Sequence, residues 1–208
     1  MRIQPHRAHA AGKWKGGTFL TETDRGAAAY EQYLSGDDGG MEELIRLYRA
    51  GLEGFIGGYV CNEAEAEELC EEVFFRLASR RPEWRYRGVS FKAYVYAMGR
   101  NLALNHLRRE KHRAEEPPED FSDILTAGET PEERILRDER DLVLHTAMRS
   151  LPPDYRAVLY LSYFARLDNA ACAAVMRKTK RQIENLLSRA RKALRETLEK
   201  GGFTYEDQ

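Results

Sequence analysis

Long apolar runs are absent from this 208-residue sequence. No stretch approaches the roughly 18 consecutive apolar residues that a membrane-spanning helix needs, so we expect no membrane insertion. The first residues include Arg2, His6, Arg7 and His9 without an apolar core, which argues against a secretory signal. We therefore expect a cytoplasmic protein.

Cysteine is scarce as well. The three cysteines, Cys61, Cys70 and Cys172, are far apart and form no CxxC pair, which argues against a disulfide framework and against a zinc site. The sequence has no glycine-rich phosphate-binding loop, and His106 and His112 have no evident catalytic companions. We expect no enzymatic activity, no cofactor and no metal site.

The net charge is only −1, yet the charges are segregated along the chain. Residues 63–72 contain six glutamates and no basic residue, whereas residues 85–113 contain eight basic residues and one acid. A second acidic block spans 115–141 and a second basic block spans 177–195. Such blocks are typical of a protein that binds both a polyelectrolyte and a protein partner, although four solvated helix faces would give the same pattern.

Helical periodicity runs through most of the chain, and no segment keeps the two-residue alternation of a β-strand. Residues 1–25 lack periodicity and are expected to form a disordered arm, followed by a short helix over 27–34. After a turn at 35–40, an apolar helical stripe begins at Met41 and continues for about five turns. These patterns predict an all-α protein.

Two more helices complete the first predicted domain, residues 26–113. Asn62 can cap a helix whose apolar stripe ends at Leu77. The segment 80–89 contains proline and glycine and is expected to form a loop, after which a long basic helix begins near Ser90.

An acidic, proline-containing segment, residues 114–131, is expected to form a flexible linker between two small helical domains. The second domain is expected over 132–202, followed by a short tail at 203–208. Its helices are predicted over 132–150, 154–164, 168–176 and from 180 to about 200.

The second domain ends in a short helix, a tight turn and a long basic helix, the order of a helix-turn-helix DNA-binding motif. Asp168 can cap the short helix, and Thr179 with Gln182 forms a capping box for the long one. Opposite its apolar stripe, the long helix has residue types that read base edges, with further basic residues nearer the phosphates. These residues are Arg181, Glu184, Asn185, Ser188 and Lys192, flanked by Lys180 and Arg189. A basic surface helix without a DNA partner is the alternative interpretation.

The loop and the long helix of the first domain combine aromatic and basic side chains. The aromatic residues are Trp84, Tyr86, Phe91, Tyr94 and Tyr96, and the basic residues beside them are Arg85, Arg87 and Lys92. Aromatic rings can stack on unpaired bases while cations hold the phosphates, which indicates single-stranded nucleic acid. Asn101 and Asn105 lie at the margin of the helix's apolar stripe, where an asparagine is more often a hydrogen-bonded core amide.

Three glutamates, Glu68, Glu71 and Glu72, lie with Phe75 on the helix face opposite the apolar stripe of residues 66–77. Clustered carboxylates repel DNA, so we expect this face to bind a basic protein. The face lacks His or Asp at metal-ligand spacing, and it lacks a pocket or nucleophile for acid–base catalysis.

Four segments have short motifs, in this order: residues 66–74 (AEELCEEVF), 91–109 (FKAYVY, RN and LRR), 151–156 (LPPDYR) and 182–191 (QIENLLSRAR). Together they resemble bacterial RNA polymerase sigma factors of the extracytoplasmic-function class. The resemblance covers about residues 27–200. The sequence departs from the family's usual motifs at Glu68 and Glu71, where Asp and Gln are common, and at Tyr94, where Trp is common.

The resemblance implies a subunit that binds core RNA polymerase and directs it to promoters, in the cytoplasm and at the nucleoid of a bacterium. It assigns polymerase binding to Glu68, Glu71, Glu72 and Phe75. It assigns binding of the duplex minus-thirty-five element to Lys180, Arg181, Glu184, Asn185, Ser188, Arg189 and Lys192. It assigns binding of the single-stranded minus-ten element to Trp84, Arg85, Tyr86, Arg87, Lys92, Arg100, Asn101, Asn105, Arg108 and Arg109.

The resemblance also implies an anti-sigma factor as a partner. The alternative function is a stand-alone helix-turn-helix regulator whose first domain senses a signal or dimerises. The acidic face discriminates between the two, because a repressor has no need of it.

Overall fold

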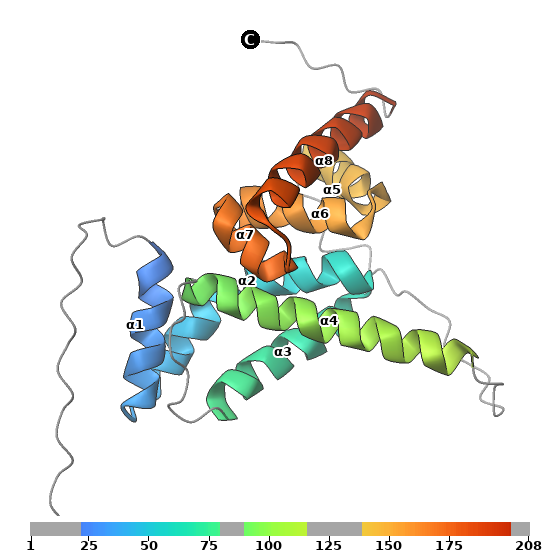
Figure 1. Ribbon diagram of the computed structural model, residues 1–208. Coiled ribbons are helices and arrows are strands. Elements are labelled where there is room, and N and C mark those ends of the chain that lie inside the picture. Colours follow the sequence, from blue (N-terminus) through green and yellow to red (C-terminus); the bar gives the residue numbers. More distant parts are fainter. Residues whose placement is uncertain (1–21, 80–89, 116–138, 201–208) are drawn as a thin grey trace, which may run out of the picture.

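A computed structural model describes residues 22–79, 90–115 and 139–200, and it contains no strand in these ranges. The all-α prediction is therefore confirmed where the structure is described. The elements are α1 (Glu22–Leu34), α2 (Gly39–Val60), α3 (Glu63–Ser79), α4 (Phe91–Glu115), α5 (Glu139–Ser150), α6 (Pro153–Leu159), the π-helical turn η1 (Tyr160–Phe164), α7 (Asn169–Met176) and α8 (Lys180–Lys200). Helices α1 to α4 form a first lobe, and α5 to α8 form a second lobe on one side of it (Figure 1).

The first lobe is built around the apolar stripe of α2. As predicted from the periodicity, its stripe is buried, at Leu44, Tyr48, Leu52, Phe55, Ile56 and Tyr59. Helix α1 begins at Glu22 and is longer than the helix predicted over 27–34. Its Tyr30 is fully buried, and the Tyr30 hydroxyl donates to the Leu77 carbonyl oxygen at 3.3 Å, which ties α1 to the end of α3.

Local capping fixes where α3 and α4 begin. The Glu65 N–H donates to the Asn62 side-chain oxygen at 3.3 Å, so the predicted cap is confirmed. The Ser90 hydroxyl accepts from the Ala93 N–H at 3.2 Å at the start of α4. The predicted loop between them, 80–89, lies outside the described residues.

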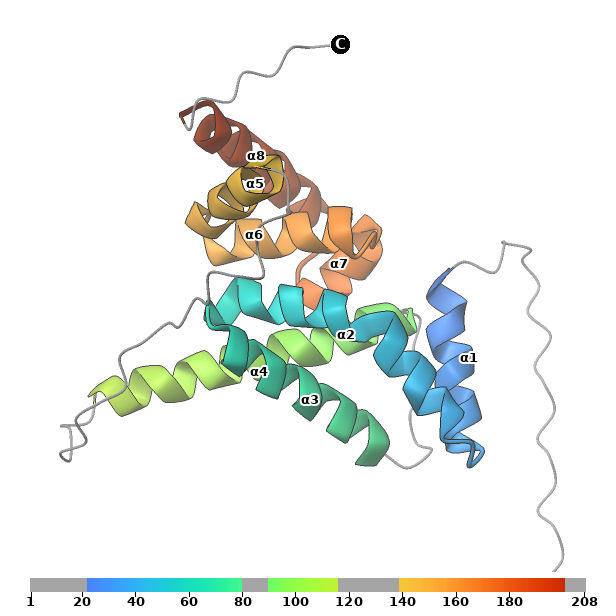
Figure 2. The same cartoon turned by 180° about the vertical axis from the view of Figure 1, so that it is seen from behind.

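The first half of helix α4 is largely buried. No residue from 91 to 104 is exposed, and this part of α4 packs against α1, α2, α3 and α7. Gly99 permits the approach of α2, because a Cβ at this position would lie 2.8 Å from a Leu52 methyl carbon. The second half of α4 extends beyond the bundle (Figures 1 and 2).

The second lobe has the predicted helix-turn-helix. Asp168 caps α7 by accepting from the Ala171 N–H at 2.7 Å, and Arg177 ends it with a left-handed φ of 53°. Thr179 and Gln182 form the predicted capping box, with bonds of 2.7 and 3.2 Å. The stripe of α8 is buried at Ile183, Leu187, Ala190 and Leu198.

The two lobes share one continuous apolar core. Helix α2 packs against α6 and η1, and α4 packs against α7 (Figure 2). The sequence predicted two domains but not their relative orientation, and this contact is the main feature that it did not predict.

Replacing Thr179 with alanine removes the hydroxyl that caps α8. We expect the free energy of unfolding to fall by about 1 kcal/mol, as for other helix caps, measured by urea denaturation of the whole chain. Thr179→Ser keeps the hydroxyl and should remain within about 0.5 kcal/mol of the parent. Equal stability of the alanine variant and the parent would contradict a capping role.

Candidate functional site

The acidic face of α3 is exposed and surrounds an apolar side chain. Glu68, Glu71 and Glu72 lie within one turn and a half, and the nearby Phe75 side chain is 67% exposed. Burial is the usual state of a phenylalanine, so one that remains this exposed amid carboxylates marks a surface suited to a partner.

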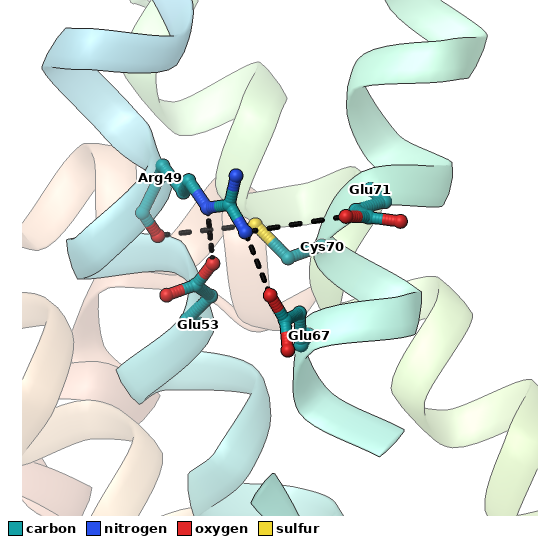
Figure 3. Close-up of polar contacts among 5 residues, drawn as sticks. All are labelled: Arg49, Glu53, Glu67, Cys70 and Glu71. Carbon is teal, nitrogen blue, oxygen red and sulfur yellow. Dashed lines mark hydrogen bonds and ion pairs between the residues drawn. The ribbon is translucent and has the colours of Figure 1, made fainter. Parts of the chain in front are cut away.

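Part of the acidic charge on α3 is compensated from α2. Arg49 lies between the two helices and contacts Glu53 at 2.7 Å, Glu67 at 2.8 Å and Glu71 at 3.9 Å (Figure 3). The hydrogen bond to Glu53 is the main cause that raises the pKa of Arg49. Of the three predicted glutamates, Glu71 is therefore the one that lies near a positive charge on the neighbouring helix α2.

All three predicted glutamates line a hollow between α3 and α4. Glu72 pairs with Arg76 on its own helix at 2.6 Å, and Glu68 forms no ion pair with another described residue. The hollow has a volume of about 450 Å³. Its lining comprises Glu68, Leu69, Glu71, Glu72, Phe75, Arg76, Leu102, Asn105, His106 and Arg109.

The hollow brings together residues that the sequence assigned to two different partners. Asn105 and Arg109, predicted to contact minus-ten DNA, share it with the acidic face. His106 was not predicted as a site residue, yet its ring Nε2 is hydrogen-bonded to a carboxylate oxygen of Glu65 at 3.0 Å and so holds α4 to α3. The four-residue spacing of Asn105 and Arg109 places both on one helix face, a signal that could have grouped them.

The other predicted minus-ten residues do not form one exposed patch. Trp84, Arg85, Tyr86 and Arg87 lie outside the described residues. On α4, Lys92, Arg100 and Asn101 are half-buried, and Arg108 is exposed and donates to the Asn105 side-chain oxygen at 3.2 Å.

Arg100 faces the interior side of the first lobe. Burial raises the pKa of Tyr59 on α2, and the nearby Arg100 guanidinium acts in the opposite direction. The charges of Asp154 and Arg156 on α6 also act on Tyr59, so Arg100 lies near the contact between the lobes.

The predicted minus-thirty-five residues share a single exposed face of α8. All seven are exposed: Lys180, Arg181, Glu184, Asn185, Ser188, Arg189 and Lys192. Lys192 has one weak partner, Glu196, at 3.8 Å. The helix therefore presents its polar face to solvent while its stripe is buried in the second lobe.

Comparison with known families accounts for both lobes. Residues 44–113 match Sigma-70 region 2, and residues 141–194 match Sigma-70, region 4. The chain is an extracytoplasmic-function sigma factor. As such it binds core RNA polymerase and directs initiation at promoters, and the alternative of a stand-alone regulator is not favoured.

Characterised relatives span both lobes. The RNA polymerase sigma-H factor of Pseudomonas aeruginosa is 28% identical over 81% of this chain and 91% of its own. The ECF RNA polymerase sigma factor SigW of Bacillus subtilis is 22% identical over 81% of this chain and 94% of its own.

Solved structures show the same fold. The sigma factor RpoE of Bartonella quintana, solved with the anti-sigma factor NepR, aligns with a TM-score of 0.61 at 20% identity, over 76% of this chain and 96% of that one. CnrH, solved with the cytosolic domain of CnrY, aligns with a TM-score of 0.55 at 16% identity, over 85% of this chain and 97% of that one.

Two further observations concern the described residues alone. None of their helices is both long and apolar enough to cross a membrane. No group of three or more His, Cys, Asp or Glu side chains within these ranges is arranged to hold a metal ion.

The cysteines should differ sharply in reactivity. Burial raises the pKa of the Cys70 thiol to about 12 and also raises that of Cys172, so both are neutral at pH 8, whereas the reactive form is the thiolate. Cys61 is exposed.

We expect iodoacetamide at pH 8 to modify Cys61 in the folded chain, and all three cysteines in urea, as read by peptide mass spectrometry. Modification of Cys70 in the folded chain as fast as Cys61 would contradict this packing.

Proposed function

We propose that the exposed face around Phe75 is the surface that docks on core RNA polymerase. The observation that supports it is an exposed aromatic ring beside Glu68 and Glu72 at the rim of a hollow. Complementary charge steers such a face to a basic partner, and a large aromatic supplies the desolvated anchor. The lining residues Asn105 and Arg109 then belong to the docking surface as well.

The exposed face of α8 reads the duplex minus-thirty-five element. Its first residues, Lys180 and Arg181, open the second helix of a helix-turn-helix, the position that contacts base edges in the major groove. Arg181 suits guanine and Asn185 suits adenine, while Arg189 is placed for a phosphate.

The first half of α4, with the segment 84–91, captures the unpaired minus-ten element. Lys92, Arg100 and Asn101 provide cations and an amide on this helix. The chain works in the bacterial cytoplasm, at the nucleoid. RNA synthesis is carried out by the polymerase, and we assign no reaction to this chain. An anti-sigma factor is the expected regulator, because the structural neighbour RpoE was solved in complex with the anti-sigma factor NepR.

Charge reversal tests the docking surface. In the variant Glu68→Lys with Glu72→Lys, we expect co-purification with core polymerase to fall at least tenfold, because two of the three glutamates that line the hollow are reversed in charge. Binding of duplex DNA by α8 should be unchanged.

Glu63→Lys is the matched control for this experiment. It reverses an exposed charge on the same helix, outside the hollow, at a cost of about 0.3–1 kcal/mol at the helix N-terminus. Equal loss of polymerase in the control and the test variant would overturn the assignment of the docking surface.

Replacement of Arg181 by alanine tests the reading face. We expect promoter binding by the reconstituted polymerase to weaken by about 1–3 kcal/mol, with base preference relaxed at one position. Arg195→Ala removes the same side chain about 21 Å further along the helix axis and should leave base preference intact. If the Arg181 variant loses affinity equally for all DNA sequences, Arg181 contacts a phosphate and not a base.

A further inference from the structure

Cys61 lies at the corner between α2 and α3. It directly follows the last residue of α2 and precedes Asn62, the cap of α3. Its backbone has a left-handed φ of 58°, and its N–H donates to the Gly57 carbonyl oxygen at 3.0 Å, which ends α2. Glycine is the usual residue at such a cap, because a Cβ is unfavourable in this conformation. The chain instead places an exposed thiol there.

A buried guanidinium is directed at this thiol. Arg156 on α6 is only 8% exposed, and its Nη1 donates to the Cys61 sulfur at 3.7 Å and to the Arg149 carbonyl oxygen at 3.0 Å. Its Nε is buried and has no hydrogen-bond partner. Because thiol sulfur is a weak acceptor, the donor that points at Cys61 is poorly satisfied as well.

Arg156 also lacks a counter-ion within the described residues. Asp154, two residues earlier on the same helix, pairs with Lys178 at 3.1 Å instead. Buried charges are ordinarily paired, because the burial of an unpaired charge is costly. Of the two acceptors that Arg156 contacts, the carbonyl oxygen is chemically inert, and only the Cys61 sulfur can be converted into a stronger acceptor.

A hydroperoxide can carry out this conversion. The Cys61 sulfur, as the thiolate, attacks one peroxide oxygen, so that an S–O bond forms while the O–O bond breaks. The sulfur loses two electrons, which reduce the peroxide. With hydrogen peroxide the products are a sulfenic acid on Cys61 and one water molecule, formed from the leaving hydroxide and the thiol proton.

Arg156 is placed to assist this step. The leaving oxygen develops negative charge as the O–O bond breaks, and a charged N–H donor beside the sulfur stabilises it by a charge-assisted hydrogen bond. From these observations we propose that Cys61 is a site of oxidation by hydroperoxides, with the Arg156 guanidinium as the donor to the peroxide. The proposal depends neither on the polymerase-docking surface nor on the DNA-reading helix.

The chain has no second thiol with which this sulfenic acid could react. Its other two cysteines, Cys70 and Cys172, are both buried. The co-reactant is therefore an external low-molecular-weight thiol, which forms a mixed disulfide with Cys61 while water leaves. Thiol–disulfide exchange with a second thiol restores the reduced chain, so the modification is reversible.

The test compares two reagents at the same sulfur. The folded chain is treated at pH 8 either with hydrogen peroxide and excess dimedone, which traps the sulfenic acid, or with iodoacetamide. Peptide mass spectrometry gives the rate constant of each reaction at Cys61. Both reagents require the thiolate and access to it, so the ratio of the two rate constants isolates the stabilisation of the leaving oxygen. We expect this ratio to be about tenfold higher for Cys61 than for free N-acetylcysteine.

Variants of Arg156 test the donor. Arg156→Met removes the charge and keeps an unbranched side chain, and we expect the ratio at Cys61 to fall about tenfold. Arg156→Lys keeps a charge without the planar fork of donors and should lower the ratio about threefold, which provides a second measurement if the methionine variant loses its helical circular dichroism. Arg149→Ala is the matched control, because it removes an exposed cation nearby but leaves the carbonyl that Arg156 contacts, and it should match the parent.

A second measurement tests the mixed disulfide. Treatment of the parent chain with hydrogen peroxide and then with reduced glutathione should add one glutathione at Cys61 and none at the two buried cysteines. Dithiothreitol should remove it.

Two outcomes would overturn the proposal. If the ratio for parent Cys61 equals that of free N-acetylcysteine, Cys61 is an ordinary exposed thiol. If both Arg156 variants keep the parent ratio, or if Arg149→Ala lowers it as much as they do, Arg156 is not the donor to the peroxide. Neither result bears on polymerase docking, which is measured separately by co-purification.

Discussion

Burial of the first half of α4 is the constraint on which the rest of the structure depends. This helix lies at the centre of the molecule and packs against α1, α2, α3 and α7. Three of these neighbours belong to its own lobe, and their buried apolar side chains form the first-lobe part of the shared core. The fourth belongs to the second lobe, so α4 takes part in the contact that joins the two lobes.

Much of the fold could be predicted from sequence because its determinants are local. The stripe that begins at Met41 and the caps at Asn62, Asp168 and Thr179 each depend on residues within a few positions of one another. The contact between the lobes could not be predicted in this way. It depends on the pairing of Gly54 with Tyr160, more than a hundred positions away, and a glycine within a helical pattern does not reveal what approaches it.

The candidate surfaces differ in the same way: one depends on local sequence, and the other depends on how two helices pack. The face of α8 could be assigned because amphipathic periodicity in one helix fixes which residues are exposed. The hollow beside Phe75 could not, because it is made by two helices, and their relative rotation decides that Asn105 and Arg109 lie with the glutamates of α3. Arg49 is a further example: its ion pairs with Glu67 and Glu71 cross between helices and partly compensate the charge of Glu71, one of the three glutamates predicted from the sequence.

The central claim is that one chain reads two separated DNA elements on behalf of the polymerase. Selection of bound duplexes from a random DNA library by the reconstituted chain and core polymerase tests it most directly. The account predicts that two sequence motifs are enriched together at a fixed spacing of roughly two helical turns, and that neither is enriched by core polymerase alone. Enrichment of a single motif, identical with and without the polymerase, would contradict it.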